Sequence, residues 1–83
     1  MRLPRDLSGH ELIRLLGRYG YGVTRQVGSH IRLQSTLRGY AHHLTVPDHR
    51  SLRLGTLSTI LSDVAAYLNI ERSKLEQDLF TKS

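Results

Sequence analysis

The sequence predicts an α+β fold in which helices cover one face of a three-stranded antiparallel sheet. Apolar residues recur with helical spacing near both ends of the chain, whereas between residues 21 and 47 they alternate with the period of a strand. The chain has 83 residues, a length that predicts one small domain over residues 1–83. A sheet of three strands must bury one face, and the helices are the only elements available to cover it.

The first helix is expected over residues 9–19. Ser8 and Glu11 stand three residues apart, which is the spacing of a capping box at a helix start. Gly20 follows the last apolar residue, at the position where a left-handed residue often ends a helix. The apolar stripe between these two signals consists of Leu12, Ile13, Leu15, Leu16 and Tyr19.

Three strands with short connections follow, and they predict an antiparallel meander. Gly28-Ser29 forms the first turn and Leu37-Arg38-Gly39 forms the second. Pro47 is expected to end the third strand, because proline has no N–H to donate to the ladder. The strands are predicted at residues 23–27, 30–34 and 40–46.

Two further helices are predicted after the strands. Aliphatic residues recur at helical spacing after Gly55-Thr56, which predicts a helix over residues 56–68. A short third helix is predicted over about residues 72–80. We expect it to present an acidic face, which is exposed to solvent, lies over the basic sheet or meets a partner. The order α-β-β-β-α-α, with the helices on one face, is the arrangement of a double-stranded-RNA-binding fold.

Alternation along the strands assigns their side chains to faces. Because the apolar residues must face the helices, His30 and Arg32 of the second strand and His43 of the third are expected to share the open face. The residues expected to face inward are Ile31, Leu33, Leu44 and Val46.

Val27 leaves one alternative open. A strict two-residue turn at Gly28-Ser29 places Val27 and His30 on the same face, which puts the valine in solvent. A bulge near the turn would instead return Val27 to the buried face.

The charge of the chain is basic and unevenly distributed. The formal net charge is +5 at pH 7, and residues 1–55 carry nine arginines against three acidic residues, whereas the remainder is slightly acidic. An arginine-rich half of a small domain predicts binding to a polyanion, with nucleic acid as the leading candidate. The alternative is a soluble basic surface that has no such partner.

Composition excludes several classes of protein. The chain has no cysteine, so it holds no disulfide framework and no Cys-based zinc site. No apolar run is long enough to span a bilayer or to serve as a signal-peptide core. We therefore expect a cytoplasmic protein without a membrane partner, and its small size favours a surface site over a buried cavity.

An exposed histidine beside arginines, next to a Gly-Ser turn, is suited to phosphodiester chemistry. The imidazole of His30 can take or give a proton near neutral pH, and arginine holds a phosphate through two hydrogen bonds. RNA carries its own nucleophile, the 2′-hydroxyl, so the reaction requires no metal ion. The alternative is an exposed histidine without a role.

Other histidines and tyrosines admit functional and structural interpretations. His42 and His43 are adjacent strand residues that point to opposite faces, so they cannot chelate one ion together. A set of His30, His43 and His49 is geometrically possible but lacks an acidic or Cys ligand, and we expect no metal and no cofactor. Tyr21 and Tyr40 flank strands and could stack on a base, although core or rim packing is the favoured role of all four tyrosines.

Three motifs occur in order along the chain: RQVGSH at residues 25–30, LTVPDH at 44–49 and GTLSTIL at 55–61. Together with an opening helix that contains ELIRLL, they resemble the HicA (YcfA-like) toxin family over about residues 7–70. Members of that family are small mRNA interferases of bacterial and archaeal toxin–antitoxin modules. They have a double-stranded-RNA-binding-like fold, and the HicB antitoxin neutralises them.

The resemblance implies specific roles and also shows two departures. The family's catalytic histidine falls on His30, and Gly28 and Ser29 would set the turn that presents it. The basic segment at residues 50–54 differs from the family pattern, and residues 72–83 extend beyond the family-like core. These departures bear on substrate preference and on the fit to the antitoxin.

The sequence therefore predicts a metal-independent endoribonuclease, an mRNA interferase toxin of a type II toxin–antitoxin system. His30 is expected to act as general base or acid, and Arg25, Arg32, Ser29 and His43 are candidate RNA contacts. The expected partners are mRNA and a HicB-like antitoxin, and a homodimer is left open. The alternatives are a non-catalytic RNA-binding module that uses the same face and a protein-interaction module that acts through the acidic C-terminal helix.

Overall fold

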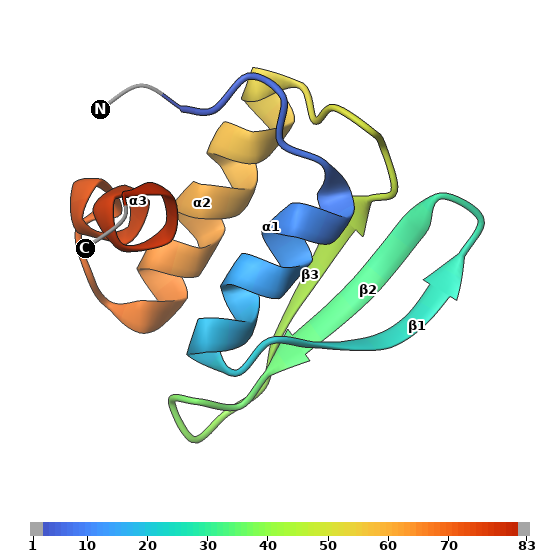
Figure 1. Ribbon diagram of the computed structural model, residues 1–83. Helices are drawn as coiled ribbons and strands as arrows, with labels where there is room; N and C mark the ends of the chain where they lie inside the picture. Colours follow the sequence, from blue (N-terminus) through green and yellow to red (C-terminus); the bar gives the residue numbers. More distant parts are fainter. Residues whose placement is uncertain (1–2, 82–83) are drawn as a thin grey trace.

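The computed structural model describes residues 3–81 and confirms the α+β fold (Figure 1). The three strands form one antiparallel sheet in the order β1-β2-β3. Within residues 3–81, none of the helices combines the length and the apolar character that crossing a membrane requires. The elements are α1 (Gly9–Leu16), a 3-10 turn (Gly17–Tyr19), β1 (Gly22–Val27), β2 (His30–Ser35), β3 (His42–Pro47), α2 (Leu54–Leu68) and α3 (Arg72–Phe80).

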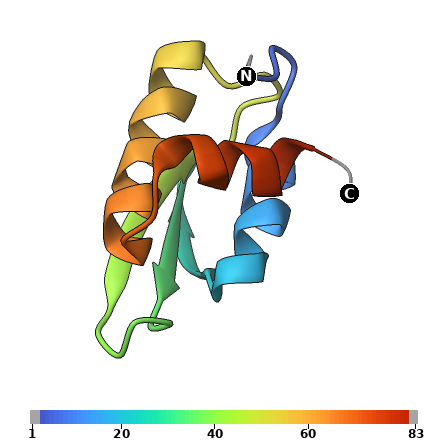
Figure 2. The same cartoon turned by 90° about the vertical axis from the view of Figure 1, so that its left-hand side faces the viewer.

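The elements stack in layers, and the sheet is covered on one side only. Figure 2 shows α3 crossing in front of α1 and α2, with the strands behind these two helices. In the described part of the chain, no element lies on the other face of the sheet, which we call the open face. Helix α3 carries Arg72 and Lys74 against Glu76 and Asp78, so it is neutral and not acidic as expected. It does not lie over the basic face of the sheet, which excludes one of the three placements considered for it.

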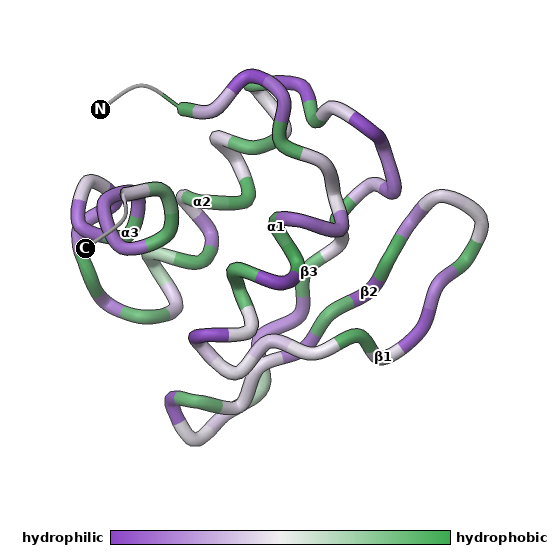
Figure 3. The backbone as a smooth tube through the Cα atoms, viewed as in Figure 1, coloured by the Kyte–Doolittle hydropathy of each residue, from purple (hydrophilic) through white to green (hydrophobic). Residues whose placement is uncertain are grey.

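The core lies between the sheet and the helices and confirms the predicted inward-facing residues. Polar and apolar residues alternate along β2, as Figure 3 shows, and the apolar ones are buried. Burying an aliphatic side chain of this size contributes about 1.5–3 kcal/mol to folding. The core side chains include Leu12 and Leu16 from α1, Ile31 and Leu33 from β2, Leu44 and Val46 from β3, Leu57 and Leu61 from α2, and Leu75 and Leu79 from α3.

The predicted capping box starts α1. The Ser8 hydroxyl accepts from the Glu11 N–H at 3.0 Å, and the Glu11 carboxylate accepts from the Ser8 N–H at 2.9 Å. These hydrogen bonds hold the pKa of Glu11 below its usual range. The final turn of the predicted helix is 3-10, and Gly20 ends it with a φ of +82°.

Several element boundaries differ from the prediction. The third strand begins at His42 instead of Tyr40, because the Tyr40 carbonyl accepts a hydrogen bond from the Tyr67 hydroxyl at 2.6 Å. Pro47 ends that strand as predicted, although it is itself the last strand residue, paired with His30, and lies one residue beyond the predicted bound. Helix α2 begins at Leu54, two residues before the predicted start.

The alternatives at Val27 are resolved in favour of the strict turn. Val27 pairs directly with His30, Gly28 has a φ of +59°, and the Val27 side chain is 61% exposed. The bulge lies farther along β1, between Val23 and Arg25, where it cannot return Val27 to the core. Val27 therefore lies in solvent beside His30.

A cluster of aromatic rings ties the second turn to α2. The rings of His42 and Tyr67 stack with centroids 4.7 Å apart, and the Tyr21 hydroxyl lies 2.6 Å from His42 Nδ1. Burial raises the pKa of Tyr21, so its hydroxyl keeps its proton within hydrogen-bond distance of the His42 ring. Tyr21 and Tyr67 are thus core residues, whereas Tyr40 is 60% exposed and packs edge-on against Tyr67.

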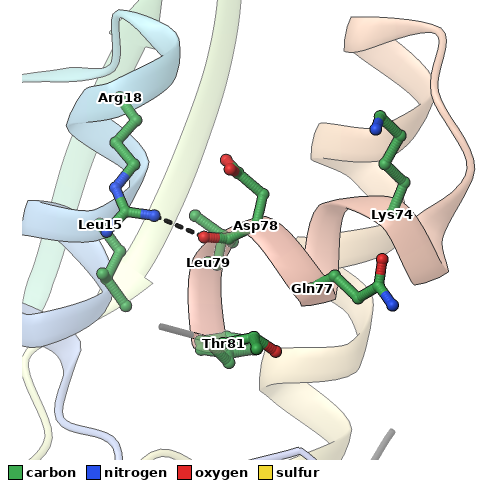
Figure 4. Close-up of a pocket in the computed structure, with 8 residues that line it drawn as sticks. Leu15, Arg18, Lys74, Gln77, Asp78, Leu79 and Thr81 are labelled. Carbon is green, nitrogen blue, oxygen red and sulfur yellow. Dashed lines mark hydrogen bonds between the residues drawn. The ribbon is translucent and has the colours of Figure 1, made fainter. Parts of the chain in front are cut away.

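Helix α3 begins and ends as predicted and is held against the end of α1 by Asp78. Arg18 donates to the Asp78 carbonyl, as Figure 4 shows, and the Tyr19 hydroxyl donates to the Asp78 carboxylate. Burial and the hydrogen bond to Asp78 raise the pKa of Tyr19 to about 12. Helix α3 therefore caps the helical layer on the side away from the sheet.

We predict that Gly9→Ala destabilises the fold. A Cβ at residue 9 would lie 2.1 Å from the Pro47 carbonyl oxygen, so α1 would have to move from the end of β3. Overpacking of this kind costs about 1–3 kcal/mol of unfolding free energy, measured by urea denaturation. Gly55→Ala is the matched control, because its Cβ meets nothing within 4 Å and alanine favours a helix. Equal urea midpoints for the two variants would contradict this packing.

We also predict that His42 makes the fold less stable in mild acid. Burial lowers the pKa of His42, with a smaller contribution from His43 in the same direction and an opposing one from Asp63. The unfolded chain, with an ordinary histidine pKa of about 6.5, then binds the proton more readily, so unfolding free energy falls as the pH drops below that value. Between pH 7.5 and pH 5.5, the midpoint of thermal unfolding should fall less for His42→Gln than for the native chain. An equal fall in the two proteins would show that His42 does not cause the loss of stability in acid.

Candidate functional site

His30 lies on the open face, at the start of β2. The alternating burial of β2 points Ile31 and Leu33 into the core and leaves His30 and Arg32 exposed, as predicted. His30 is flanked by Val27 on β1 and by Pro47 on β3. The imidazole therefore stands on a solvent-facing surface beside an exposed apolar side chain.

Two arginines lie next to His30 on the same face. Arg25 pairs directly with Arg32 across the β1–β2 ladder, which places their Cβ atoms about 5 Å apart. Neither guanidinium has an ion pair with any of residues 3–81. Two like charges opposite each other are unfavourable, and an anion bound between them would relieve that repulsion.

The turn and the bulge together set this arrangement. The two-residue turn places Arg25 opposite Arg32, and the bulge at Thr24 then lets Val23 pair with Leu33 on the helix-covered side. The Thr24 hydroxyl donates to the Arg32 carbonyl at 3.2 Å, which holds the bulge in place. Without the extra residue, Arg25 and Val23 could not occupy opposite sides of the sheet.

The remaining predicted residues are distributed along the face. Ser29 lies in the turn, immediately before His30, and its carbonyl accepts from the Asp48 N–H at 2.6 Å. His43 also faces outward, but it pairs with Gln34, four residues along β2 from His30. At about 3.3 Å per residue, that separation is about 13 Å. The site thus groups His30 with Arg25, Arg32 and Ser29, and His43 stands apart.

The histidines do not form a metal centre in the described region. His42 and His43 point to opposite sides of β3, as predicted: His42 lies in the aromatic cluster and His43 on the open face. Across residues 3–81, no three histidine, aspartate or glutamate side chains come together in a way that could hold a metal ion. The set of His30, His43 and His49 considered from the sequence is therefore not assembled.

The structure adds a polar network behind the site that the sequence analysis missed. The side-chain amide of Gln26 donates to the Gly28 carbonyl at 3.0 Å and to the Asp48 carboxylate at 3.1 Å. The other Asp48 oxygen lies 2.9 Å from Nε2 of His10, at the start of α1. Gln26 and Asp48 are 22 residues apart, and no sequence pattern joins them.

The site is a surface, as the size of the chain predicts. A hollow of about 910 Å³ lies between α1 and α3 (Figure 4), and another of about 390 Å³ lies between β3 and α2. Neither hollow is lined by His30, Arg25 or Arg32. The open face can therefore accept an extended polyanion, whereas a small ligand would find no enclosure there.

The chain matches one family model, described as HicA toxin of bacterial toxin–antitoxin, over residues 9–65. Comparison with curated proteins and with solved structures found no match. The matched residues run from the start of α1 through the whole sheet and most of α2, and they leave α3 outside. Because the match covers more than half of the 83 residues, the chain belongs to the HicA toxin family of bacterial toxin–antitoxin systems.

Proposed function

We propose that this toxin is an endoribonuclease that cleaves mRNA without a metal ion and uses His30 as its general base or acid. The observation that carries the proposal is the position of His30 on the open face, beside the unneutralised pair Arg25 and Arg32. Membership of a toxin family supports the toxic role. The whole chain, residues 1–83, would act as one domain, in the cytoplasm where its mRNA substrate lies.

The chemistry balances without a cofactor. The 2′-oxygen of the RNA attacks the adjacent phosphorus and loses its proton, while the bond from phosphorus to the 5′-oxygen breaks and that oxygen gains a proton. The products are a 2′,3′-cyclic phosphate and a 5′-hydroxyl. The imidazole of His30 takes the first proton or supplies the second, a contribution of about 10²- to 10⁴-fold in rate.

The arginines would act on the charge of the phosphate. Arg32 lies two residues from His30 along β2, and Arg25 pairs with Arg32 from β1. Both guanidinium groups can therefore approach a phosphate beside the imidazole. Bidentate hydrogen bonds from arginine stabilise the charge that builds on the non-bridging oxygens. Ser29 would contact the same nucleotide from the turn, and His43 would contact a nucleotide farther along the strand.

A HicB-like antitoxin is the proposed protein partner. The toxin–antitoxin family implies a neutralising protein, and the open face is the surface that carries His30. An antitoxin that covers this face would block access of RNA to His30, Arg25 and Arg32 together. Acidic side chains on that antitoxin would complement the two arginines.

We predict that His30→Ala lowers the rate of RNA cleavage by at least about 100-fold, because the proton transfer loses its side chain. The assay follows the formation of product RNA in EDTA. His49→Ala, in the loop after β3, is the control for the loss of an exposed histidine elsewhere. Equal cleavage by His30→Ala and the native chain would refute the role of His30. Loss of native activity in EDTA would refute the metal-free reaction, and RNA binding without any product would establish the binding module instead.

We further predict that Arg25→Ala and Arg32→Ala each weaken RNA binding and flatten its salt dependence. Each lost phosphate contact should reduce the slope of log affinity against log salt by about 0.7 for a single strand. A 2′-O-methyl RNA, which lacks the nucleophile, isolates binding from cleavage in a titration at several salt concentrations. Arg14→Ala, on α1, controls for net charge. An equal change of slope in Arg14→Ala would show that the effect is general charge.

A further inference from the structure

The turn that presents His30 lacks support from apolar packing. All six residues of β1 are exposed, and Val23 and Val27 leave 55% and 61% of their surface in solvent. Figure 1 shows the β1–β2 hairpin extending away from the helices. A two-residue turn at the end of such a hairpin would move freely unless polar contacts hold it.

Three hydrogen bonds hold this turn, and two of them join the hairpin to the loop after β3. The Gln26 amide donates to the Gly28 carbonyl and to the Asp48 carboxylate, and the Asp48 N–H donates to the Ser29 carbonyl. We call the Gln26 and Asp48 side chains, with the backbone bond to Ser29, the turn clamp. Both carbonyls that precede His30 in the turn therefore have a partner in the clamp.

The clamp is anchored in the rigid part of the molecule. Asp48 follows the last residue of β3, and its second carboxylate oxygen lies 2.9 Å from His10 Nε2 on α1. The Gly9 N–H donates to the His49 carbonyl at 3.0 Å, and Gly9 lies against the Pro47 carbonyl. The exposed turn is thus tied to the start of α1 and the end of β3.

The clamp lies behind the open face. Gln26 pairs with Ile31, whose side chain is buried under the helices, so Gln26 projects to the same covered side. RNA bound on the open face beside His30 would not touch Gln26 from that side. The pair is therefore placed to act on the backbone of the turn and not on the substrate.

We propose that Gln26 and Asp48 are positioning residues that hold the Gly28-Ser29 turn so that the His30 imidazole meets the scissile phosphate. This inference rests on the proposed role of His30. A displacement of about 1 Å at a catalytic group can reduce a rate by about 100-fold, so three hydrogen bonds at this turn are sufficient to matter.

The experiment compares Gln26→Ala, Asp48→Ala, Asp48→Asn and the double alanine variant with the native chain. Single-turnover cleavage at saturating protein reports the chemical step, and titration with 2′-O-methyl RNA reports binding. The NMR resonances of the His30 ring report the turn directly, even where cleavage is absent. Gln77→Ala, the same substitution on α3, is the matched control, and thermal midpoints confirm that each variant is folded.

Gln26→Ala and Asp48→Ala should each slow cleavage by about 10- to 100-fold and leave RNA affinity within twofold. The double variant should be no slower than the slower single variant, because both changes release the same turn. Asp48→Asn keeps an oxygen that can accept from Gln26, so its rate should recover to within about threefold of native. The His30 resonances should shift in both alanine variants and not in Gln77→Ala.

Unchanged rates with unchanged His30 resonances would overturn the inference, as would a loss of affinity that matches the loss of rate. Asp48→Asn as slow as Asp48→Ala would also overturn it, because the charge of Asp48 and not its hydrogen bond with Gln26 would then set the rate. If His30→Ala cleaves like the native chain, the proposed function fails. The His30 resonances then still decide whether the clamp sets the turn.

Discussion

One-sided burial of the sheet is the constraint on which the rest of this structure depends. Alternate residues of β2 and β3 place Ile31, Leu33, Leu44 and Val46 against α1 and α2, and that burial supplies most of the apolar contact between sheet and helices. Because the strand period is two, every residue between these is forced to the other side. The open face, with His30 on it, is thus a direct consequence of how the core is packed.

The β1–β2 hairpin shows how the protein holds the candidate site without burying it. A tight turn with Gly28 in the left-handed region sets the register, and the register places Arg25 opposite Arg32. Strand β1 and the turn have little apolar support, so hydrogen bonds from Gln26 and Asp48 fix the end of the hairpin. Polar contacts of this kind constrain geometry while they leave the opposite face free for a large partner.

The small size of the domain and the proposed chemistry agree with each other. A chain of 83 residues has little volume for an enclosed pocket, and a reaction in which RNA supplies its own nucleophile needs only a surface with a positioned imidazole and cationic partners. Helix α3 lies outside the family match and packs on the far side through Asp78. It therefore adds to the core without covering the face that carries the site.

Local patterns in the sequence determined the order of helices and strands, the capping box at Ser8 and the exposure of His30 and Arg32, because these depend on periods of two and 3.6 residues. Only the tertiary structure decided that Val27 lies in solvent, that His42 stacks on Tyr67, and that Asp48 holds the turn before His30. Each of these depends on register or on contacts between distant segments, such as that between Gln26 and Asp48, which are 22 positions apart. Periodicity assigns a side chain to a face, whereas its neighbours on that face are set by how the strands pair and the helices pack.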